Sequence, residues 1–425
     1  MSAARDLFVE EARGVSVEEA MTILPLGPLV RISATGEYAG PCPACGGTDR
    51  FAVNPARGRW LCRGSIGGRD ALSLAGHVHG LDLKSQDGFL RACSALLGRD
   101  PPDGSEESDA DRREREARLR SRREANERAQ AERDSAAFDH REAERARARG
   151  KWQHAEREGD HLLYLARRLD CWRRELPVAP FLRTIRSETY WHGRDARGHA
   201  AELHSGPAMV APFVDADGVV VGCHLTWIDF DCSPKFRPRI SDPQNPRERP
   251  LPSKKMRGSK KGGLIPLIGF YQVGPLILPD VSRRRVVTGE GIENVLAVAL
   301  AEGPRADTLY CAAGDLGNLA GPADPASRFT HPDLKKADRR GVMRSVFVQG
   351  PVPKPDQAPD DAMPFPAHAA EVLLLGDSDS EIYATAAAMG RAKRRAEGMG
   401  ALADIAWPPR GMDFADLVSA APSRN

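Results

Sequence analysis

One segment, residues 111–150, divides this 425-residue chain because it cannot contribute to a buried core. It contains thirteen Arg, ten Asp or Glu and no Lys, and its large apolar residues are Leu119 and Phe138 alone. A helix that packs on a core needs an apolar stripe about 100° wide, and this segment has none. We therefore expect a solvated, helical or partly disordered linker stabilised by Arg–Glu pairs four residues apart. A nucleic-acid-binding arm is the less favoured alternative, because the interleaved acids cancel most of the positive field.

The chain on either side of this linker has the composition of folded domains. The whole sequence is 41% hydrophobic and 28% charged, and its length suits two to four domains. Four regions are predicted: a cysteine-containing, ribbon-like β domain (1–100), the charged helical linker (101–160), a core subdomain with a basic loop (161–280), and a C-terminal α/β domain (281–425).

Several classes of protein are excluded by composition. A collagen or a disordered tail would lack this apolar content, and the most apolar window, 264–279, is too short and too interrupted by Pro and Gly to span a bilayer. We expect no membrane partner. The N-terminus lacks a basic region followed by an apolar run, which favours a cytoplasmic protein. Eight unevenly spaced cysteines favour metal binding or burial over a disulfide framework.

The C-terminal part alternates strands and helices. Short strands are predicted at 285–288, 308–312, 371–375 and 403–407, with a helix at 382–397 between the last two. This alternation favours a mostly parallel, doubly wound α/β sheet, whose active sites lie at the carboxyl ends of its strands. Further upstream, Asp217-Gly218 lies between two apolar runs and predicts a β-hairpin, so the chain as a whole is α+β. A loop is expected from 235 to 261.

The cysteine spacing indicates a zinc site. Cys42 and Cys45 form a C-x2-C pair, and Cys62 opens what would be a second pair. The position that would complete it is Ser65, whose neutral hydroxyl is a poor zinc ligand. Three other residues could supply the fourth ligand: His77, His79 and Cys93. A weak or absent metal is the alternative to a structural Zn2+.

The segment from Gly40 to Gly80 resembles the zinc-binding domain of bacterial-type (DnaG-like) DNA primases, especially those of phages and mobile elements. That family's ribbon engages template single-stranded DNA, so the resemblance implies nucleic-acid contacts for its basic and aromatic residues: Arg50, Phe51, Arg59, Trp60 and Arg63. Basic side chains among aromatic rings suit backbone tracking and base stacking. A place in the ribbon core for the rings, and on the solvated surface for the arginines, is an equally open alternative.

Carboxylates follow three of the predicted C-terminal strands. Glu290 comes after the first, Asp377 and Asp379 come after the third, and Asp413 and Asp416 come after the fourth. Carboxylates at the carboxyl ends of parallel strands can converge, and a hard cation such as Mg2+ then relieves their repulsion. Two such ions can stabilise the attacking and the leaving oxygen of a phosphoryl displacement.

This order of acidic motifs resembles the Toprim domain. The resemblance implies that Glu290 is the catalytic acid and that Asp377 and Asp379 act with it in catalysis and bind Mg2+ or Mn2+, with Asp416 and Glu293 as second-rank candidates. The family's Asp-x-Asp is usually followed by Ala-Gly, where this chain has residues 380–382, Ser-Glu-Ile. Asp315 is expected to cap a helix.

A basic segment precedes the Toprim-like part. Residues 235–261 hold ten Lys or Arg and two acids. Five of these bases are predicted to contact nucleoside triphosphates or the template backbone: Lys254, Lys255, Arg257, Lys260 and Lys261. Because no G-x4-G-K-[ST] phosphate loop occurs, we expect no fused helicase, and a separate replicative helicase is a candidate partner.

The favoured hypothesis is a DNA primase that uses nucleoside triphosphates to make short RNA primers on a single-stranded DNA template. The net charge of +2 hides a charge of +8 over residues 235–261 and of −5 over residues 355–425, where eleven acids face six bases. A basic segment for polyanions and an acidic pocket for cations suit a metal-dependent polymerase of nucleic acid. Two alternatives stay open: a Toprim nuclease that uses the same acids, and a non-catalytic single-strand-binding protein of replication.

Overall fold

The computed structural model divides into two compact units, Met1–Ala136 and Ala137–Asn425. It describes residues 3–32, 36–63, 67–102, 109–194, 198–243, 250–337, 343–378 and 380–420. Ser65 and Asp379, which the sequence singles out, lie outside these residues. In the described helices, no segment is both long enough and apolar enough to cross a membrane.

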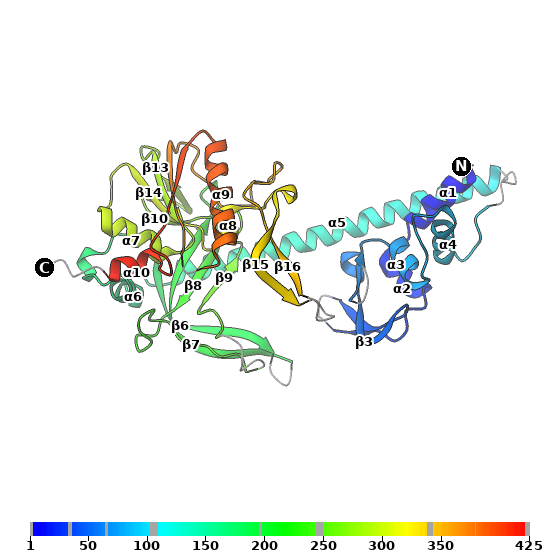
Figure 1. Ribbon diagram of the computed structural model, residues 1–425, viewed down its shortest axis with the longest axis horizontal. Helices are drawn as coiled ribbons and strands as arrows, with labels where there is room; N and C mark the ends of the chain where they lie inside the picture. The colour runs from blue at the N-terminus through cyan, green and yellow to red at the C-terminus, as the bar shows by residue number, and fades with distance from the viewer. Residues whose placement is uncertain are drawn as a thin grey trace. The chain divides into compact units, whose positions relative to one another are not determined.

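The first unit is built on a five-stranded antiparallel sheet in the order β1-β2-β3-β4-β5 (Figure 1). Its strands are β1 (Val30–Arg31), β2 (Tyr38–Cys42), β3 (Gly46–Asn54), β4 (Arg59–Cys62) and β5 (Gly67–Gly68). Its short helices are α1 (Ala3–Arg13), α2 (Val17–Ile23), α3 (Ala71–Val78) and α4 (Gln86–Leu97). Side chains alternate along β4, so Trp60 and Cys62 point into the core while Arg59 and Leu61 point to solvent. The core formed with the helices includes Phe8, Phe51 and Leu74.

The charged linker forms one continuous helix, α5 (Asp109–His154), as the charge pattern predicts. Its described side chains are exposed along most of its length, and Phe138 is 54% exposed. The last turns differ, because Ala148 and Trp152 are buried in the core of the second unit. The Trp152 indole N–H donates to the carbonyl of Phe181, at 2.8 Å. The end of this helix therefore belongs to the second unit.

After the end of α5, the second unit continues with α6 (Asp160–Arg168) and an antiparallel sheet in the order β6-β7-β8-β9. Its strands are β6 (Arg183–Arg194), β7 (Ala200–Val214), β8 (Val220–Trp227) and β9 (Lys254–Gly258). Strands β7 and β8 confirm the predicted hairpin. The loop prediction for 235–261 is wrong in part, because Lys254–Gly258 pairs with β8 in the register Thr226 to Lys254.

The carboxyl-terminal sheet has the order β10-β14-β13-β17-β18. Its strands are β10 (Ile265–Ile268), β13 (Arg285–Gly289), β14 (Thr308–Ala312), β17 (Glu371–Leu375) and β18 (Leu402–Ala406). The last four are parallel and confirm the predicted strands, while β10 is antiparallel at the edge.

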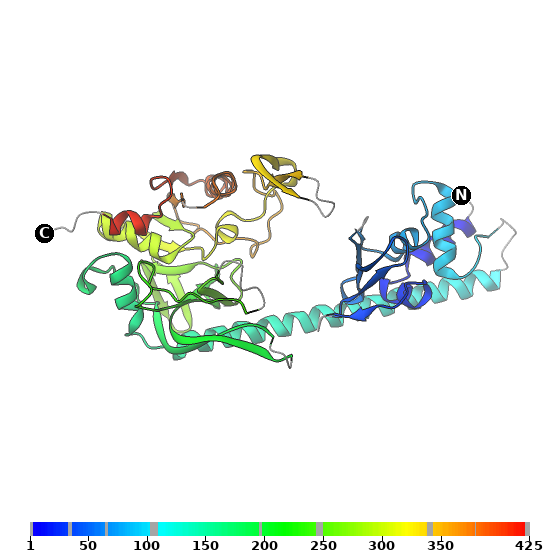
Figure 2. The same ribbon diagram turned by 60° about the horizontal axis from the view of Figure 1, so that its bottom comes forward.

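Helices cover both faces of this sheet (Figures 1 and 2). They are α7 (Ile292–Glu302), α8 (Leu316–Ala320), α9 (Ile382–Gly398) and α10 (Phe414–Ser419). One core contains Val295 of α7 and Ala415 of α10, and a separate core contains Leu319 of α8 and Met389 of α9. The sheet is therefore doubly wound, and Asp315 caps α8 as predicted. Two hairpins complete the unit: β11 (Phe270–Val273) with β12 (Leu276–Pro279), and β15 (Phe329–Ala337) with β16 (Met343–Val348).

Candidate functional site

Four zinc-type ligands lie together in the first unit. The Nε2 atom of His77 is 3.2 Å from the Sγ of Cys42, and the Sγ of Cys62 is 3.5 Å from that of Cys42 and 3.4 Å from that of Cys45. Cys42 ends β2, Cys62 ends β4, and His77 lies in the last turn of α3. A tetrahedron with zinc–sulfur bonds of about 2.3 Å has edges of about 3.8 Å. The ligand atoms of Cys42, Cys62 and His77 all lie within 4.8 Å of one another, so these three fit a zinc ion, with Cys45 beside Cys62. Of the substitutes for position 65, His77 is the one brought to the cysteines.

The surroundings prepare these ligands for a metal. Burial raises the pKa of the Cys42 thiol, but the backbone N–H of Cys45 and the ring of His77 outweigh it and bring the pKa to about 6. The His77 ring stacks on Trp60 with the centroids 4.9 Å apart, and the Trp60 N–H donates to Ser73 at 3.0 Å. A thiolate and an oriented imidazole are what zinc requires.

The other two candidates have different roles. Cys93 lies on α4 with no exposed surface, and burial raises the pKa of its thiol to about 11. It is an apolar core residue in practice. His79 is exposed and forms the C-cap of α3.

The ribbon residues predicted to touch nucleic acid divide into two groups. Phe51 is fully buried and Trp60 is 3% exposed, so both rings lie in the ribbon core, where they offer no face for a base to stack on. The three arginines Arg50, Arg59 and Arg63 are exposed. These arginines can contact a nucleic-acid backbone electrostatically, but bases cannot stack on the two buried rings.

The acids at the carboxyl edge of the carboxyl-terminal sheet are positioned by paired strands. Gly289 and Leu375 are register partners in β13 and β17, and Glu290 and Asp377 follow them at the same edge. Both are partly exposed. Between strand and acid, a Cβ at Gly376 would lie 2.4 Å from the Trp407 ring, so a larger residue there would require this ring to move. The parallel register of β13 and β17 therefore puts the residues after both strands at one edge of the sheet, while the predicted convergence of the acids on a metal stays a prediction.

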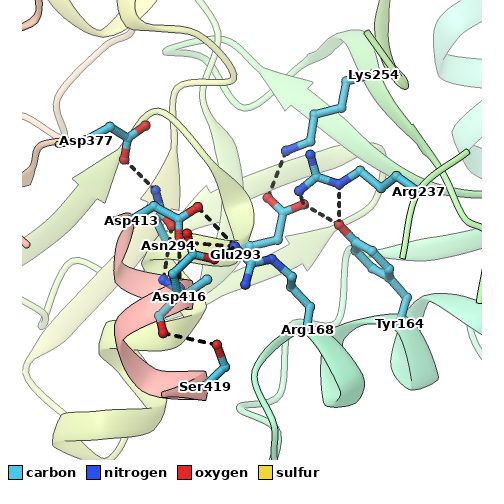
Figure 3. Close-up of polar contacts among 11 residues, drawn as sticks. Tyr164, Arg168, Arg237, Lys254, Glu293, Asn294, Asp377, Asp413, Asp416 and Ser419 are labelled. Atoms are coloured by element: carbon cyan, nitrogen blue, oxygen red, sulfur yellow. Dashed lines mark hydrogen bonds and ion pairs between the residues drawn. The ribbon is translucent and has the colours of Figure 1, made fainter. Parts of the chain in front are cut away.

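Two more acids at this edge are paired with a buried arginine (Figure 3). Arg168, on α6, is 3% exposed, and its Nη2 donates to Asp413 at 3.0 Å and to Asp416 at 2.7 Å. Asp413 also accepts the N–H of Asp416 as the N-cap of α10. Asp416, predicted as a metal ligand, is therefore held by a cation of the protein itself.

Asn294 connects these groups. Its side-chain amide donates to Asp377 at 2.6 Å and accepts the backbone N–H of Ala415 at 3.3 Å. It thus ties the acid after β17 to the start of α10 and orients the Asp377 carboxylate. The sequence does not predict this role. Asn294 lies on the first turn of the helix that follows Glu290, but only the structure shows that its amide contacts Asp377.

Glu293 is the most enclosed acid of the site and lies beside three partners (Figure 3). It is 4% exposed, and it accepts from the hydroxyl of Tyr164 at 2.7 Å, from Arg237 at 3.0 Å and from Lys254 at 2.9 Å. Burial raises the pKa of this carboxyl, but the two cations outweigh it and hold the pKa well below its usual range. Glu293 is therefore ionised and neutralised inside the protein.

The five predicted basic contacts do not form one patch. Lys254 binds Glu293, and Lys255 lies on the opposite face of β9, with its Nζ 3.7 Å from the centre of the Tyr190 ring. Lys260 pairs with Asp315. Arg257 is partly exposed, and Lys261 is exposed. Lys254 is the member of this set that reaches the carboxylate edge, through Glu293.

Sequence patterns do not reveal two of the partners of Glu293, Tyr164 and Arg237, or the arginine that binds Asp413 and Asp416. Tyr164, Arg168 and Arg237 stand far from the acidic motifs in the chain, on α6 and in the segment before β9. Their types are common and their spacing carries no motif. Arg237 does belong to the basic segment, which is the one signal that points toward it.

Magnesium is a separate question from zinc. Within the described ranges, the one group of three His, Cys, Asp or Glu whose ligand atoms lie within 4.8 Å of one another is Cys42, Cys62 and His77. Asp379, the third predicted magnesium ligand, is outside those ranges. Glu290 and Asp377 supply two carboxylates of the right chemistry at one edge, which suits a hard cation.

Comparison with known proteins supports the ribbon. Residues 37–72 match the zinc-binding domain of primase-helicase, and residues 142–267 match a domain of unknown function (DUF7146). Neither match covers half of the chain. No curated protein and no solved structure is significantly similar to it. The first unit is thus a primase-like zinc ribbon with a zinc-binding site, which indicates a role connected with replication.

Proposed function

We propose that this protein is a DNA primase of the DnaG-like type, with a zinc ribbon and a Toprim-like catalytic sheet, which makes short RNA primers on single-stranded DNA. The observation that carries the proposal is the ribbon, whose sequence matches the zinc-binding domain of primase-helicase and whose ligands Cys42, Cys62 and His77 converge. A doubly wound sheet with acids at its carboxyl edge supports it, because such an edge is where this architecture places chemistry.

The chain's own residues suggest how the catalytic edge works. Glu290, Asp377 and Asp379 would hold Mg2+ or Mn2+, and such an ion would supply positive charge for the attacking 3′-hydroxyl and the leaving pyrophosphate. Asn294 fixes the orientation of the Asp377 carboxylate. Lys254 and Arg237, already held by Glu293, place positive charge beside the edge where triphosphate charge would arrive.

Primer synthesis is the direct test. The full chain is incubated with single-stranded DNA, labelled nucleoside triphosphates and Mg2+ or Mn2+, and its products are compared with those of Glu290→Gln and Asp377→Asn. We expect new oligoribonucleotides from the wild type and a loss of about 100-fold or more in each variant. Asp404→Asn is the matched control, because this carboxylate lies on β18 but is 87% exposed.

Other outcomes identify the alternatives. Shortening of the template, lost in the same two variants, would replace the primase with a metal-dependent nuclease. Salt-sensitive binding of single-stranded DNA, with no product in either Mg2+ or Mn2+, would indicate a non-catalytic replication protein. Equal activity in Asp377→Asn and Asp404→Asn would show that the carboxyl edge is not the site of chemistry.

A further inference from the structure

The first unit contains an arginine-lined pocket that the sequence does not predict. It has a volume of about 460 Å³, within the range of roughly 300–1,000 Å³ that ligand pockets occupy. Arg57 lines it from the β3–β4 turn, Arg59 from the first residue of β4 and Arg69 from the segment just before α3, and Gln130 and Arg133 line it from α5. All of these residues belong to the unit Met1–Ala136.

The lining has one sign of charge. None of its residues is acidic, and the four arginines are exposed. Across the part of the chain that the structure describes, no ion pair joins the side chain of Arg57, Arg59 or Arg69 to a carboxylate. Gathering the guanidinium groups of Arg57, Arg59 and Arg69 costs repulsion, which an anionic ligand would relieve.

The backbone beneath these arginines is fixed. The side chain of Asn54 accepts the N–H of Arg57 at 3.0 Å and caps the short 3-10 turn Pro55–Arg57. Gly58 then takes a left-handed φ of 56°, which lets the chain reverse into β4. The Nη1 of Arg133 donates to the carbonyl of Ala56 at 3.4 Å, so α5 contacts this turn directly.

The lining residues also indicate which kind of ligand the pocket can bind. No aromatic ring and no large apolar side chain contributes to it, so the pocket offers nothing on which a base could stack. Arginine matches phosphate oxygens with two parallel hydrogen bonds. The chemistry therefore selects phosphate groups without reading bases.

We propose that Arg57, Arg59, Arg69 and Arg133 form a phosphate-binding site, completed by helix α5, that takes phosphate groups of a nucleic-acid backbone or of a nucleoside triphosphate. The choice of these two ligands rests on the proposed function. The inference of an anion site rests only on the geometry and charge of the pocket. The linker helix is then part of a binding surface rather than a spacer alone.

The test measures binding of labelled oligo-dT to the full chain by fluorescence anisotropy at several salt concentrations. In Arg57→Gln, Arg69→Gln and Arg133→Gln we expect affinity to fall about three- to tenfold. In a plot of the logarithm of the association constant against the logarithm of the salt concentration, the magnitude of the slope should fall by about 0.7 for each phosphate that the variant no longer neutralises. Arg128→Gln is the control, since Arg128 is an exposed arginine of α5 outside the pocket. Zinc content and circular dichroism confirm that each variant is folded.

A parallel titration with ATP distinguishes the two sources. Competition by ATP, with weaker ATP binding in the same three variants, would assign the site to the triphosphate. Arginine-dependent binding of oligo-dT that ATP does not displace would assign it to the backbone. If Arg133→Gln and Arg69→Gln bind both probes as Arg128→Gln does, the proposal is overturned. Failure of primer synthesis with the expected binding losses would reject the proposed function and leave this site in place.

Discussion

Two glutamates three residues apart, Glu290 and Glu293, have opposite surroundings. Glu290 is partly exposed at the end of β13, whereas Glu293 is buried between Arg237 and Lys254. The sequence motif ranks Glu290 first and leaves Glu293 in second place. It cannot show that Glu293 is a neutralised structural acid, because its partners come from segments far away in the chain.

This difference predicts opposite phenotypes for the two amide variants. Glu293→Gln leaves two enclosed cations without their counter-charge, and breaking a buried pair in this way costs about 3–5 kcal/mol in the free energy of unfolding. Glu290→Gln should change the free energy of unfolding by less than about 0.5 kcal/mol relative to the wild type. Urea unfolding of both variants, followed by tryptophan fluorescence, measures the two values. Equal stabilities would mean that the Glu293 network contributes little to the fold.

Two buried histidines predict how the second unit responds to acid. Burial lowers the pKa of His161 to about 4, with a smaller effect of Arg173, and burial with nearby Lys254 lowers that of His224 to about 3. The unfolded chain has ordinary values near 6.5, so it binds these protons first as pH falls. Stability should therefore be highest above about pH 6.5 and decline toward pH 4, by up to about 3 kcal/mol for His161.

Unfolding in urea at pH 7, 6, 5 and 4 checks this dependence. His161→Gln should flatten the decline, since it removes one of the two protons taken up on unfolding. His140→Gln is the matched control, because His140 is exposed on α5. An unchanged pH profile in His161→Gln would exclude this histidine as a source of the acid sensitivity.

Among the elements, those with strong local signals are the ones that sequence predicts. Each parallel strand of the carboxyl-terminal sheet is a short apolar run with turn residues around it, and burial on both faces requires that pattern. Strand β9 is a different case, because its sequence, Lys-Lys-Met-Arg-Gly, is basic and indicates a loop. Its strand conformation comes from pairing with β8, a tertiary effect that no local pattern contains.

The zinc ligands differ in how far the sequence predicts them. The spacing of the cysteines predicts Cys62 as a ligand. His77 is one of several candidates in the sequence, and the packing of α3 brings it to the cysteines.

Helix α5 predicts two contrasting effects along one element. Trp152 is 1% exposed in the core of the second unit, so Trp152→Ala should destabilise that unit by about 3–5 kcal/mol. Phe138, 54% exposed on the same helix, should tolerate Ala with a change below about 0.5 kcal/mol. Thermal unfolding of both variants measures the contrast. A large effect of Phe138→Ala would show that the middle of the helix is covered in solution.

On the scale of the whole molecule, the two units have separate cores. The core of the first consists of residues between Phe8 and Leu97, and the cores of the second consist of residues from Ala148 onward. The zinc ligands belong entirely to the first unit and the carboxylate edge to the second. A chain built in this way should unfold in two steps, since neither core depends on side chains of the other.

Zinc removal tests that separation. Structural zinc contributes directly to folding, so chelation should lower the unfolding temperature of the first unit by more than about 10 °C and leave that of the second within about 2 °C. Calorimetry resolves the two transitions, and tryptophan fluorescence assigns the second one, because five of the six tryptophans, all but Trp60, lie in the second unit. His77→Ala should reproduce chelation and lose zinc affinity by at least about 100-fold, whereas His79→Ala should not. A chelator that shifts both transitions equally would show that the ribbon and the carboxyl-terminal sheet fold as one cooperative body. An unshifted first transition would show that zinc does not contribute to the stability of the ribbon.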